Sequence, residues 1–304
     1  MPPPLREVTE QFLGRGGPAV VAGLRALAAI DATAAAALPP LPYHDPRFSS
    51  RVLFQQLDQS TDQSSRRMSI IARQVAWLVD RLPTGSLRRV FHPLCGPGLF
   101  ALALRARGAE SYVGVDIGPA VVTFARKAFA ADPAVVFRRS DALSHSPAGE
   151  PFSAALLTYE ALNAFPPGPA LALLMSIAAV LRPGGWLAVD VRMGESAPPA
   201  DGRDWSYHRG GSVFAAGPHL LLDEWGPLGP PGIVAGHRFI VMEPRRAAPV
   251  AVLHSLVWSY PPAELEALLG GAGFELVTVE QPFVFDSDVA EAAAPVIALA
   301  RRRG

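Results

Sequence analysis

The feature that most constrains the fold is an alternation of short apolar runs with helical patterns between Leu87 and Met193. The apolar runs have the length of strands, and three of the segments between them repeat apolar residues at helical spacing. Strands that alternate with helices in this way form βαβ units and give a parallel sheet. Strands are expected at 88–94, 111–117, 134–142, 152–160 and 186–193, and helices at 99–108, 119–130 and 170–182.

The segments on either side of this alternation differ in character. The N-terminal part contains an Ala-rich stretch at 18–38 and an amphipathic pattern at about 64–82, which predict helices. After Met193, glycine, proline and tryptophan are frequent, and runs such as HRFIVME and AVLHSLVW predict antiparallel strands. We therefore expect four parts: a helical cap at 1–85, a core at 86–194, an antiparallel insert at 195–258, and a helix with two last strands at 259–304.

Composition narrows the classes of function. Basic and acidic residues balance at 27 each, so the chain lacks the positive charge that binding to nucleic acid requires. Cys95 is the single cysteine, which excludes an intrachain disulfide and a cysteine metal cluster, and no metal is expected. The start, MPPPLREV, lacks the layout of a signal peptide, and charged residues interrupt the Ala-rich stretch. We expect a cytoplasmic protein that acts on a small molecule without a membrane, and the oligomeric state stays open.

A set of small and acidic residues follows the predicted strands. The run VFHPL leads into CGPG at 95–98, where small residues let backbone N–H groups approach a ligand at a helix N-terminus. Asp116 ends the next strand, where an acid can accept hydrogen bonds from ribose hydroxyls. Asp141 ends the third, where its carboxylate can accept from an adenine amino group while Ala142 or Leu143 packs on the ring. These positions predict a nucleotide site at one edge of the sheet.

A Pro-Gly-Gly turn in LRPGGWLAVDV adds a fourth feature in the same order along the chain. Together the four features resemble the class I S-adenosylmethionine-dependent methyltransferases over roughly Leu87 to Met193. HDPRFSSRVLFQQLDQSTDQSSRR and WSYPPAELEALLGGAGF are similar to a bacterial small-molecule branch of that family. The resemblance implies an α/β fold with a doubly wound, mainly parallel, seven-stranded Rossmann-like sheet, a helical N-terminal cap and an antiparallel insert. It also implies S-adenosylmethionine as cofactor and methyl transfer to a small molecule in secondary metabolism.

The resemblance also implies roles for individual residues. Gly96 and Gly98 would line the methionine part of the cofactor, and Asp116 would bind the ribose. Arg66 is a candidate partner for the cofactor carboxylate, because arginine can pair with it through two hydrogen bonds; the alternative is a solvated helix face. The full expected cofactor set is Arg66, His92, Leu94, Cys95, Gly96, Gly98, Asp116, Ile117, Asp141, Ala142, Thr158 and Tyr159.

Contacts to the acceptor molecule are expected from other positions. Glu160, just after a strand end, is the first candidate for a base that removes a proton from the acceptor. His208 and His254 of the insert follow in that order, with structural roles as the alternative. Candidates for acceptor contact are Tyr43, Asn163 and Tyr207.

Three residues depart from the family pattern at the first turn. His92 stands where the family usually has an acid, Leu94 stands where it has a glycine, and Pro93 removes a backbone donor. Because a histidine cannot place the cationic end of the methionine as an acid does, other reactions stay open. These are an S-adenosylmethionine cyclase that releases methylthioadenosine, a cyclase or isomerase on the same fold, and a non-catalytic partner subunit.

Overall fold

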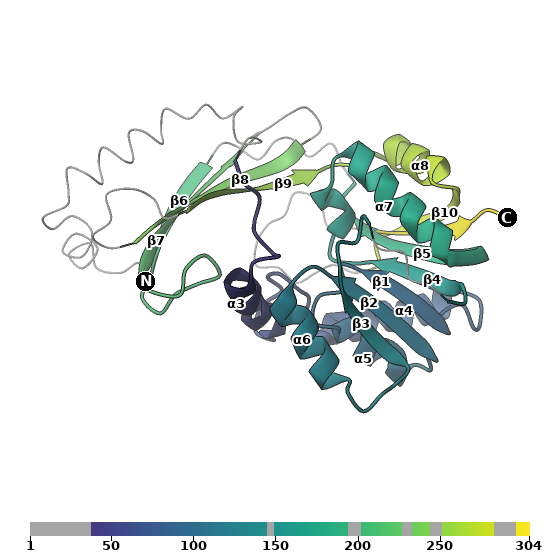
Figure 1. Cartoon of the computed structure of the whole chain (residues 1–304). Coiled ribbons are helices and arrows are strands. Elements are labelled where there is room, and N and C mark those ends of the chain that lie inside the picture. Colours follow the sequence, from purple (N-terminus) through teal and green to yellow (C-terminus); the bar gives the residue numbers. More distant parts are fainter. Residues whose placement is uncertain (1–37, 145–148, 194–201, 227–232, 244–250, 283–295) are drawn as a thin grey trace, which may run out of the picture. The chain divides into compact units, whose positions relative to one another are not determined.

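The computed structural model describes residues 38–144, 149–193, 202–226, 233–243, 251–282 and 296–304 (Figure 1). The Ala-rich helix predicted at 18–38 lies outside the described residues apart from Leu38. Contacts group the chain into two units, one formed by Met1–Pro42 with Glu195–Trp258 and the other by Tyr43–Gly194 with Ser259–Gly304. Each unit is described by itself.

The larger unit contains a seven-stranded sheet. Its strands are β1 (Arg89–Pro93), β2 (Ser111–Asp116), β3 (Val135–Arg139), β4 (Phe152–Leu157), β5 (Leu181–Val191), β10 (Phe274–Glu280) and β11 (Val296–Arg302). They are ordered β10-β11-β5-β4-β1-β2-β3, with β1 to β5 parallel and β11 antiparallel to both of its neighbours. This arrangement confirms the predicted mainly parallel Rossmann-like sheet and its antiparallel last hairpin.

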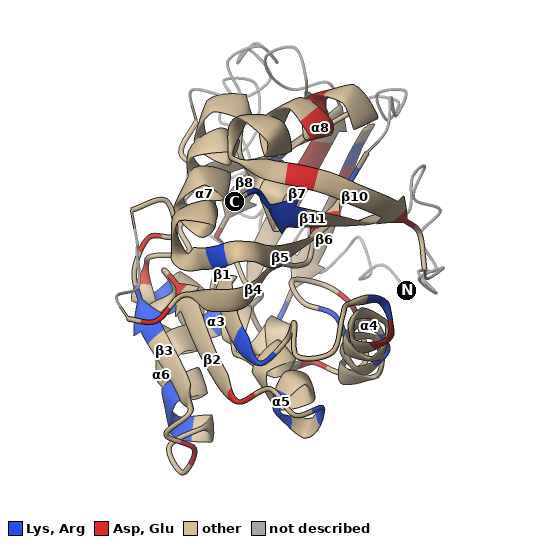
Figure 2. Ribbon diagram, turned by 90° about the vertical axis from the view of Figure 1, so that its right-hand side faces the viewer, with Lys and Arg blue, Asp and Glu red and all other residues tan. Residues whose placement is uncertain are grey.

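Helices cover both faces of this sheet, which explains why β4 in its centre is a continuous buried apolar run. Helices α4 (Met68–Arg81) and α5 (Leu99–Ala106) lie together on one side, and α7 (Pro167–Val180) and α8 (Pro262–Gly271) lie together on the other (Figure 2). Helix α6 (Pro119–Ala128) packs on β2 and β3, and α3 (Pro46–Leu57) packs on α6. No helix among the described residues is both long enough and apolar enough to span a membrane.

The Pro-Gly-Gly segment was predicted to be a turn before a strand, but in the structure it lies inside β5. Strand β5 already begins at Leu181, which pairs with Phe152, and pairing resumes only between Trp186 and Ala154. The extra residues of β5 form an irregularity within the strand, and Gly184 there has a φ of +71°. Glycine adopts this left-handed conformation without the steric penalty of a side chain, so the strand continues through the segment.

The smaller unit contains a four-stranded antiparallel sheet, which confirms the antiparallel insert. The strands β6 (Gly202–His208), β7 (His219–Gly226), β8 (Ile233–Met242) and β9 (Ala251–Trp258) follow one another in space as in sequence. Ile240 and Met242 are buried, and Leu220, Leu222 and Val252 pack against them. Along β8 burial alternates from Gly236 to Ile240, but Ile240, Val241 and Met242 are all buried, so the apolar run in HRFIVME is not a strict alternation.

The glycine turn after β1 has a tightly determined backbone. Leu94, Gly96 and Gly98 all have positive φ, at 58°, 57° and 84°. A Cβ atom on Gly98 would lie only 2.5 Å from Cζ of Phe137, so a side chain cannot fit there without displacing a core ring. Leu94 adopts the left-handed conformation that a glycine would adopt at lower energetic cost, by about 1 kcal/mol.

His92 is part of the core. Its side chain is fully buried, with Nδ1 2.8 Å from the Tyr112 hydroxyl and Nε2 3.1 Å from Oγ1 of Thr158. The ring of Phe100 packs edge-on against it at 5.4 Å. Burial lowers the pKa of His92 to about 3, so the imidazole is neutral at physiological pH.

The neutral state of His92 predicts a pH dependence of stability. An unfolded histidine has a pKa of about 6.5, so between that value and about 3 the unfolded chain binds the extra proton. Relative to a His92→Gln variant, the wild type should lose stability as the pH falls through this window, by up to about 1.4 kcal/mol per pH unit. Urea unfolding of both proteins over a series of pH values measures the difference, which cancels the other titrating groups. Parallel pH profiles would contradict a buried neutral imidazole.

A second prediction separates backbone strain from crowding at the glycine turn. Gly108 has a φ of +89° and no atom within 4 Å of a built Cβ, so it is a matched control for Gly98. Gly108→Ala should cost about 1 kcal/mol from the left-handed backbone alone. Gly98→Ala should cost a further 1–3 kcal/mol, roughly, from the contact with Phe137. Chemical unfolding measures both, and equal losses would show that the ring moves aside freely.

Candidate active site

The carboxyl ends of β1 to β5 meet at one edge of the larger sheet, and most predicted site residues follow these ends. Asp116 ends β2, and its carboxylate accepts hydrogen bonds from the N–H groups of Gly96 at 3.0 Å and Gly118 at 2.8 Å. Burial raises the pKa of Asp116, while these N–H donors act in the opposite direction. Each carboxylate oxygen can accept a further hydrogen bond, so Asp116 can also bind a ligand hydroxyl.

Helix α3 covers the turn that follows Asp116. Ser49 of α3 accepts a hydrogen bond from the Ala120 N–H at 3.1 Å, and a Cβ on Gly118 would lie 2.9 Å from the Ser49 hydroxyl. Tyr43, just before the helix, has 45% of its surface exposed. Burial and the charge of the Asp116 carboxylate raise the pKa of Tyr43.

The residues after β3 form the next part of this edge. The Ser140 N–H donates to the Asp116 carbonyl at 3.0 Å, which holds the two strand ends together. Asp141 is exposed, and its Oδ1 accepts from the Leu143 N–H at 2.9 Å. Ala142 is buried and Ile117 is partly buried. Together they give an exposed carboxylate beside apolar side chains, which suits the edge and face of a purine base.

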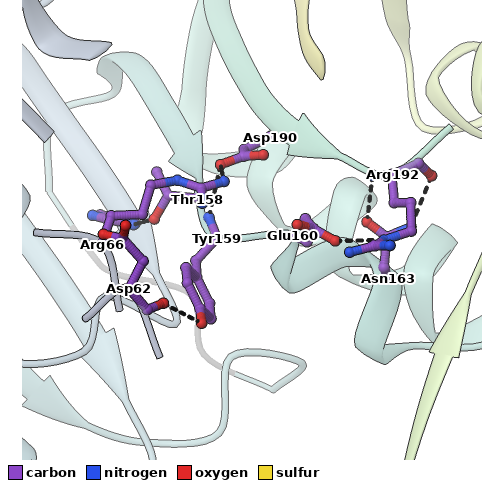
Figure 3. Close-up of polar contacts among 9 residues, drawn as sticks. Asp62, Arg66, Thr158, Tyr159, Glu160, Asn163, Asp190 and Arg192 are labelled. Carbon is purple, nitrogen blue, oxygen red and sulfur yellow. Dashed lines mark hydrogen bonds and ion pairs between the residues drawn. The ribbon is translucent and has the colours of Figure 1, made fainter. Parts of the chain in front are cut away.

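Tyr159 and Glu160, after β4, are in the left-handed conformation, with φ of 57° and 53°. Two consecutive non-glycine residues of this kind are strained, and surrounding contacts must hold them. The Tyr159 N–H donates to Oδ2 of Asp190 at 3.1 Å, and its hydroxyl donates to the Asp62 carbonyl at 2.8 Å (Figure 3). Thr158, directly before them, contacts His92.

Arg66 and Asp190 form a buried ion pair next to this turn, and the guanidinium also lies 5.3 Å from the Tyr159 ring centre (Figure 3). Burial raises the pKa of Asp190 to about 6, and the Arg66 charge opposes this rise. The alternative of a solvated helix face for Arg66 is wrong, because its side chain is only 6% exposed. Sequence reasoning missed Asp190, although a single acid inside the apolar run WLAVDV was a signal for a buried partner.

Glu160 and Asn163 both hold Arg192, the residue after β5. Oε2 of Glu160 accepts from Nε of Arg192 at 2.8 Å, with both side chains about one fifth exposed. Buried Asn163 donates to the Arg192 carbonyl at 3.0 Å and accepts from its N–H at 2.9 Å (Figure 3). The Tyr260 N–H donates to the same carbonyl at 3.5 Å, and the Tyr260 hydroxyl donates to the Phe165 carbonyl. Asn163 therefore fixes the backbone here, and Glu160 is the more open of the two.

Four expected site residues remain. Cys95 lies in the larger unit, and Tyr207, His208 and His254 lie in the smaller unit. Cys95 is buried, and burial raises the pKa of its thiol well above the usual value, so it is not an activated nucleophile. In the smaller unit, Tyr207 packs against the apolar cluster, and His208 lies 2.8 Å from the Ser206 hydroxyl. Burial lowers the pKa of His208. Nδ1 of His254 is buried and makes no hydrogen bond with the part of the chain that the structure describes.

The larger unit offers the groups that S-adenosylmethionine needs. Asp116 and Asp141 present carboxylates to hydroxyl and amino donors. The N–H groups of Cys95, Gly96 and Gly98 already donate within the fold, contrary to the expectation that they approach a ligand. Gln56 of α3 was missed by sequence reasoning. Its buried Oε1 lies beside Gly96 and has no hydrogen-bond partner among the described residues, so it can accept a ligand donor. The hydrogen-bond acceptors at this edge therefore fit the hydroxyl, amino and ammonium groups of the cofactor.

Comparison with known proteins agrees with this geometry. Residues 92–185 match the model of a family described as a methyltransferase domain. No curated protein matches the chain in sequence. Similar solved structures include the CcbJ methyltransferase from Streptomyces caelestis, at 18% identity and a TM-score of 0.60 over 85% of this chain and 98% of the other.

Two further structures carry more specific names. CalS10, an amino pentose methyltransferase from Micromonospora echinaspora solved with S-adenosylmethionine, is 17% identical over 77% of this chain and 89% of the other, with a TM-score of 0.51. KedS8, a sugar N-methyltransferase from Streptoalloteichus, is 16% identical over 78% and 87%, with a TM-score of 0.50. These identities establish a shared fold, and the family match covers the glycine turn, Asp116 and Asp141. Residues 92–185 therefore match a methyltransferase domain, and the larger unit has the Rossmann-like fold of the solved methyltransferases.

Proposed function

We propose that the protein transfers the methyl group of S-adenosylmethionine to a small molecule. The observation that carries this proposal is the Asp116 carboxylate, which joins the glycine turn to the Gly118 turn at the carboxyl edge of the sheet. Ligands of open α/β sheets bind outside this edge, where the order of the strands reverses. Strand β1 occupies that position here, between β4 and β2.

In this proposal each half of the cofactor has its own residues. Asp116 accepts hydrogen bonds from the ribose hydroxyls, and Asp141 accepts from the adenine amino group. Ile117 and Ala142 provide apolar contact to the ring. The backbone at Gly96, which has no side chain of its own, lies next to the methionine part, with the carboxamide of Gln56 on the other side of this space.

The bound cofactor supplies an electrophilic methyl group on a sulfonium. The chain must then hold the acceptor in line with it and keep water away. Glu160 is our candidate for contact with the acceptor, and Tyr159 stays a candidate for cofactor contact; both lie in the left-handed turn after β4. Glu160 remains the first candidate for taking a proton from the acceptor, which it can do through the oxygen that is not bonded to Arg192.

The acceptor is proposed to be a small molecule of secondary metabolism. One structurally similar enzyme is named an amino pentose methyltransferase and another a sugar N-methyltransferase, which makes amino sugars the first acceptors to test. Tyr207, His208 and His254 of the antiparallel sheet remain the acceptor-side candidates of the smaller unit.

The charge and cysteine content of the chain bear on its partners and its compartment. Because basic and acidic residues balance, the chain is better suited to bind a small molecule than a nucleic acid. With Cys95 as its single cysteine, the chain suits the reducing cytoplasm.

The reaction is tested by product analysis of the purified protein. Incubation with S-adenosylmethionine and a panel of amino sugars should release S-adenosylhomocysteine only when an acceptor is present, with a methylated product in equal amount. Mass spectrometry of both products measures this. Release of methylthioadenosine from the cofactor alone would instead support intramolecular cyclisation. Absence of cofactor binding by calorimetry would support a non-catalytic subunit.

The ribose site is tested at Asp116. Asp116→Asn should weaken binding of S-adenosylhomocysteine about tenfold or more, because hydrogen bonds to a charged acceptor contribute roughly 1.5–3 kcal/mol. Asp132→Asn is the matched control, since Asp132 pairs with Arg105 and accepts the Ala134 N–H in the turn before β3. Isothermal titration calorimetry measures both variants. Equal affinities for Asp116→Asn and the wild type would mean that the ribose binds elsewhere.

A further inference from the structure

The side chain of Gln56 has an unusual position in the larger unit. It is on the same face of α3 as Ser49, two helical turns earlier, and as buried Val52. Because Ser49 bonds the N-terminus of α6 next to Gly118, this face of α3 is fixed against the turns that surround Asp116. The direction of Gln56 is therefore set by the packing of the whole helix.

Gln56 reaches the glycine turn. A Cβ atom built on Gly96 would lie 3.7 Å from Nε2 of Gln56 and 4.0 Å from its Oε1. The carboxamide thus borders the space that the missing side chain of Gly96 leaves open. In the proposed function this space receives the methionine part of the cofactor.

The carboxamide oxygen of Gln56 is buried without a hydrogen bond to any described residue. Leaving a buried acceptor unpaired is costly, and such groups call for an explanation by a ligand or water. The neighbouring Gln55 shows the contrast, because its amide bonds Gln63 at 2.9 Å and accepts from the Ser64 hydroxyl at 2.5 Å. The amide of Gln55 is therefore hydrogen-bonded within the protein, whereas Oε1 of Gln56 has the capacity to accept a hydrogen bond from a ligand.

The acid that the family usually has at the end of the first strand is absent. His92 stands there, and both of its ring nitrogens face Tyr112 and Thr158 in the core. The described part of this turn therefore presents no carboxylate from β1 to a positively charged ligand group. An amide oxygen is a neutral acceptor that can bind an ammonium group through a charge-assisted hydrogen bond.

We infer that Oε1 of Gln56 accepts a hydrogen bond from the α-ammonium group of S-adenosylmethionine and so replaces the acid missing at His92. The inference rests on the proposed function and assigns a cofactor-positioning residue to it. It also explains why the site needs no acid at position 92 in β1, because Gln56 of α3 binds the ammonium group instead.

The test compares three adenosine thioethers that differ only beyond the sulfur. S-adenosylhomocysteine has the ammonium and the carboxylate, S-adenosyl-3-thiopropylamine has the ammonium alone, and methylthioadenosine has neither. Gln56→Met should weaken the first two about tenfold each and leave methylthioadenosine within about twofold of the wild type. Isothermal titration calorimetry gives the three ratios. Gln55→Met is the control and should leave all three ratios near the wild-type values.

Thermal unfolding without ligand checks for a structural role. Because Gln56 makes no hydrogen bond with the described residues, Gln56→Met should have a Tm equal to or above that of the wild type. Gln55→Met should lower the Tm, since it loses two hydrogen bonds. A marked fall in Tm for Gln56→Met would overturn the inference in favour of a structural amide.

The binding ratios also separate the ways of failing. Loss for S-adenosylhomocysteine but not for the amine would assign Gln56 to the carboxylate and overturn the ammonium contact. An equal loss for all three ligands would show that Gln56 only shapes the pocket. If the wild type binds none of them, the proposed function fails and this inference fails with it.

Discussion

The candidate site depends on the hydrogen bonds that the carboxylate of Asp116 accepts from two backbone N–H groups. This carboxylate is anchored by β2 and accepts the N–H groups of Gly96 and Gly118, so one side chain fixes the loops after two neighbouring strands. Without it, two backbone donors at the sheet edge would lose their acceptor, and the glycine turn would lose its position relative to β2. A residue that orders the loops in this way also offers its remaining lone pairs to a ligand, so structure and binding share one group.

Below this edge the larger unit contains polar side chains that are almost fully buried. His92 links Tyr112 to Thr158, and Arg66 pairs with Asp190. Such groups stabilise little by themselves, because removal from water offsets much of their attraction. They fix the geometry of the strained turn after β4 instead. His92 contacts Thr158, directly before the turn, and Asp190 accepts the N–H of Tyr159 in the turn.

The succession of strands and helices along the chain and the acids at the strand ends could be predicted from sequence, because strand periodicity and Gly or Asp at strand ends are local signals. Pairings over long separations could not. Arg66 and Asp190 lie 124 residues apart, and no local pattern connects them. The burial of His92 follows from the central place of β1 in a sheet covered on both faces, which depends on the strand order. The position of Gln56 beside Gly96 could not be predicted because it depends on how α3 packs, whereas its sequence context is that of an ordinary amphipathic helix.

The anchoring of Arg192 has a consequence for how the chain could diversify. Asn163 and Tyr260 both bond the Arg192 backbone, so the segments entering and leaving the antiparallel sheet are fastened to each other on the larger unit. Arg192 and Tyr260, which bound this stretch of the sequence, therefore lie together on the larger unit. An insertion with such ends can be lengthened, recombined or exchanged between enzymes without disturbing the register of the parent sheet. The sequence between these two ends is free to vary independently of the acids and glycines at the carboxyl edge of the larger sheet.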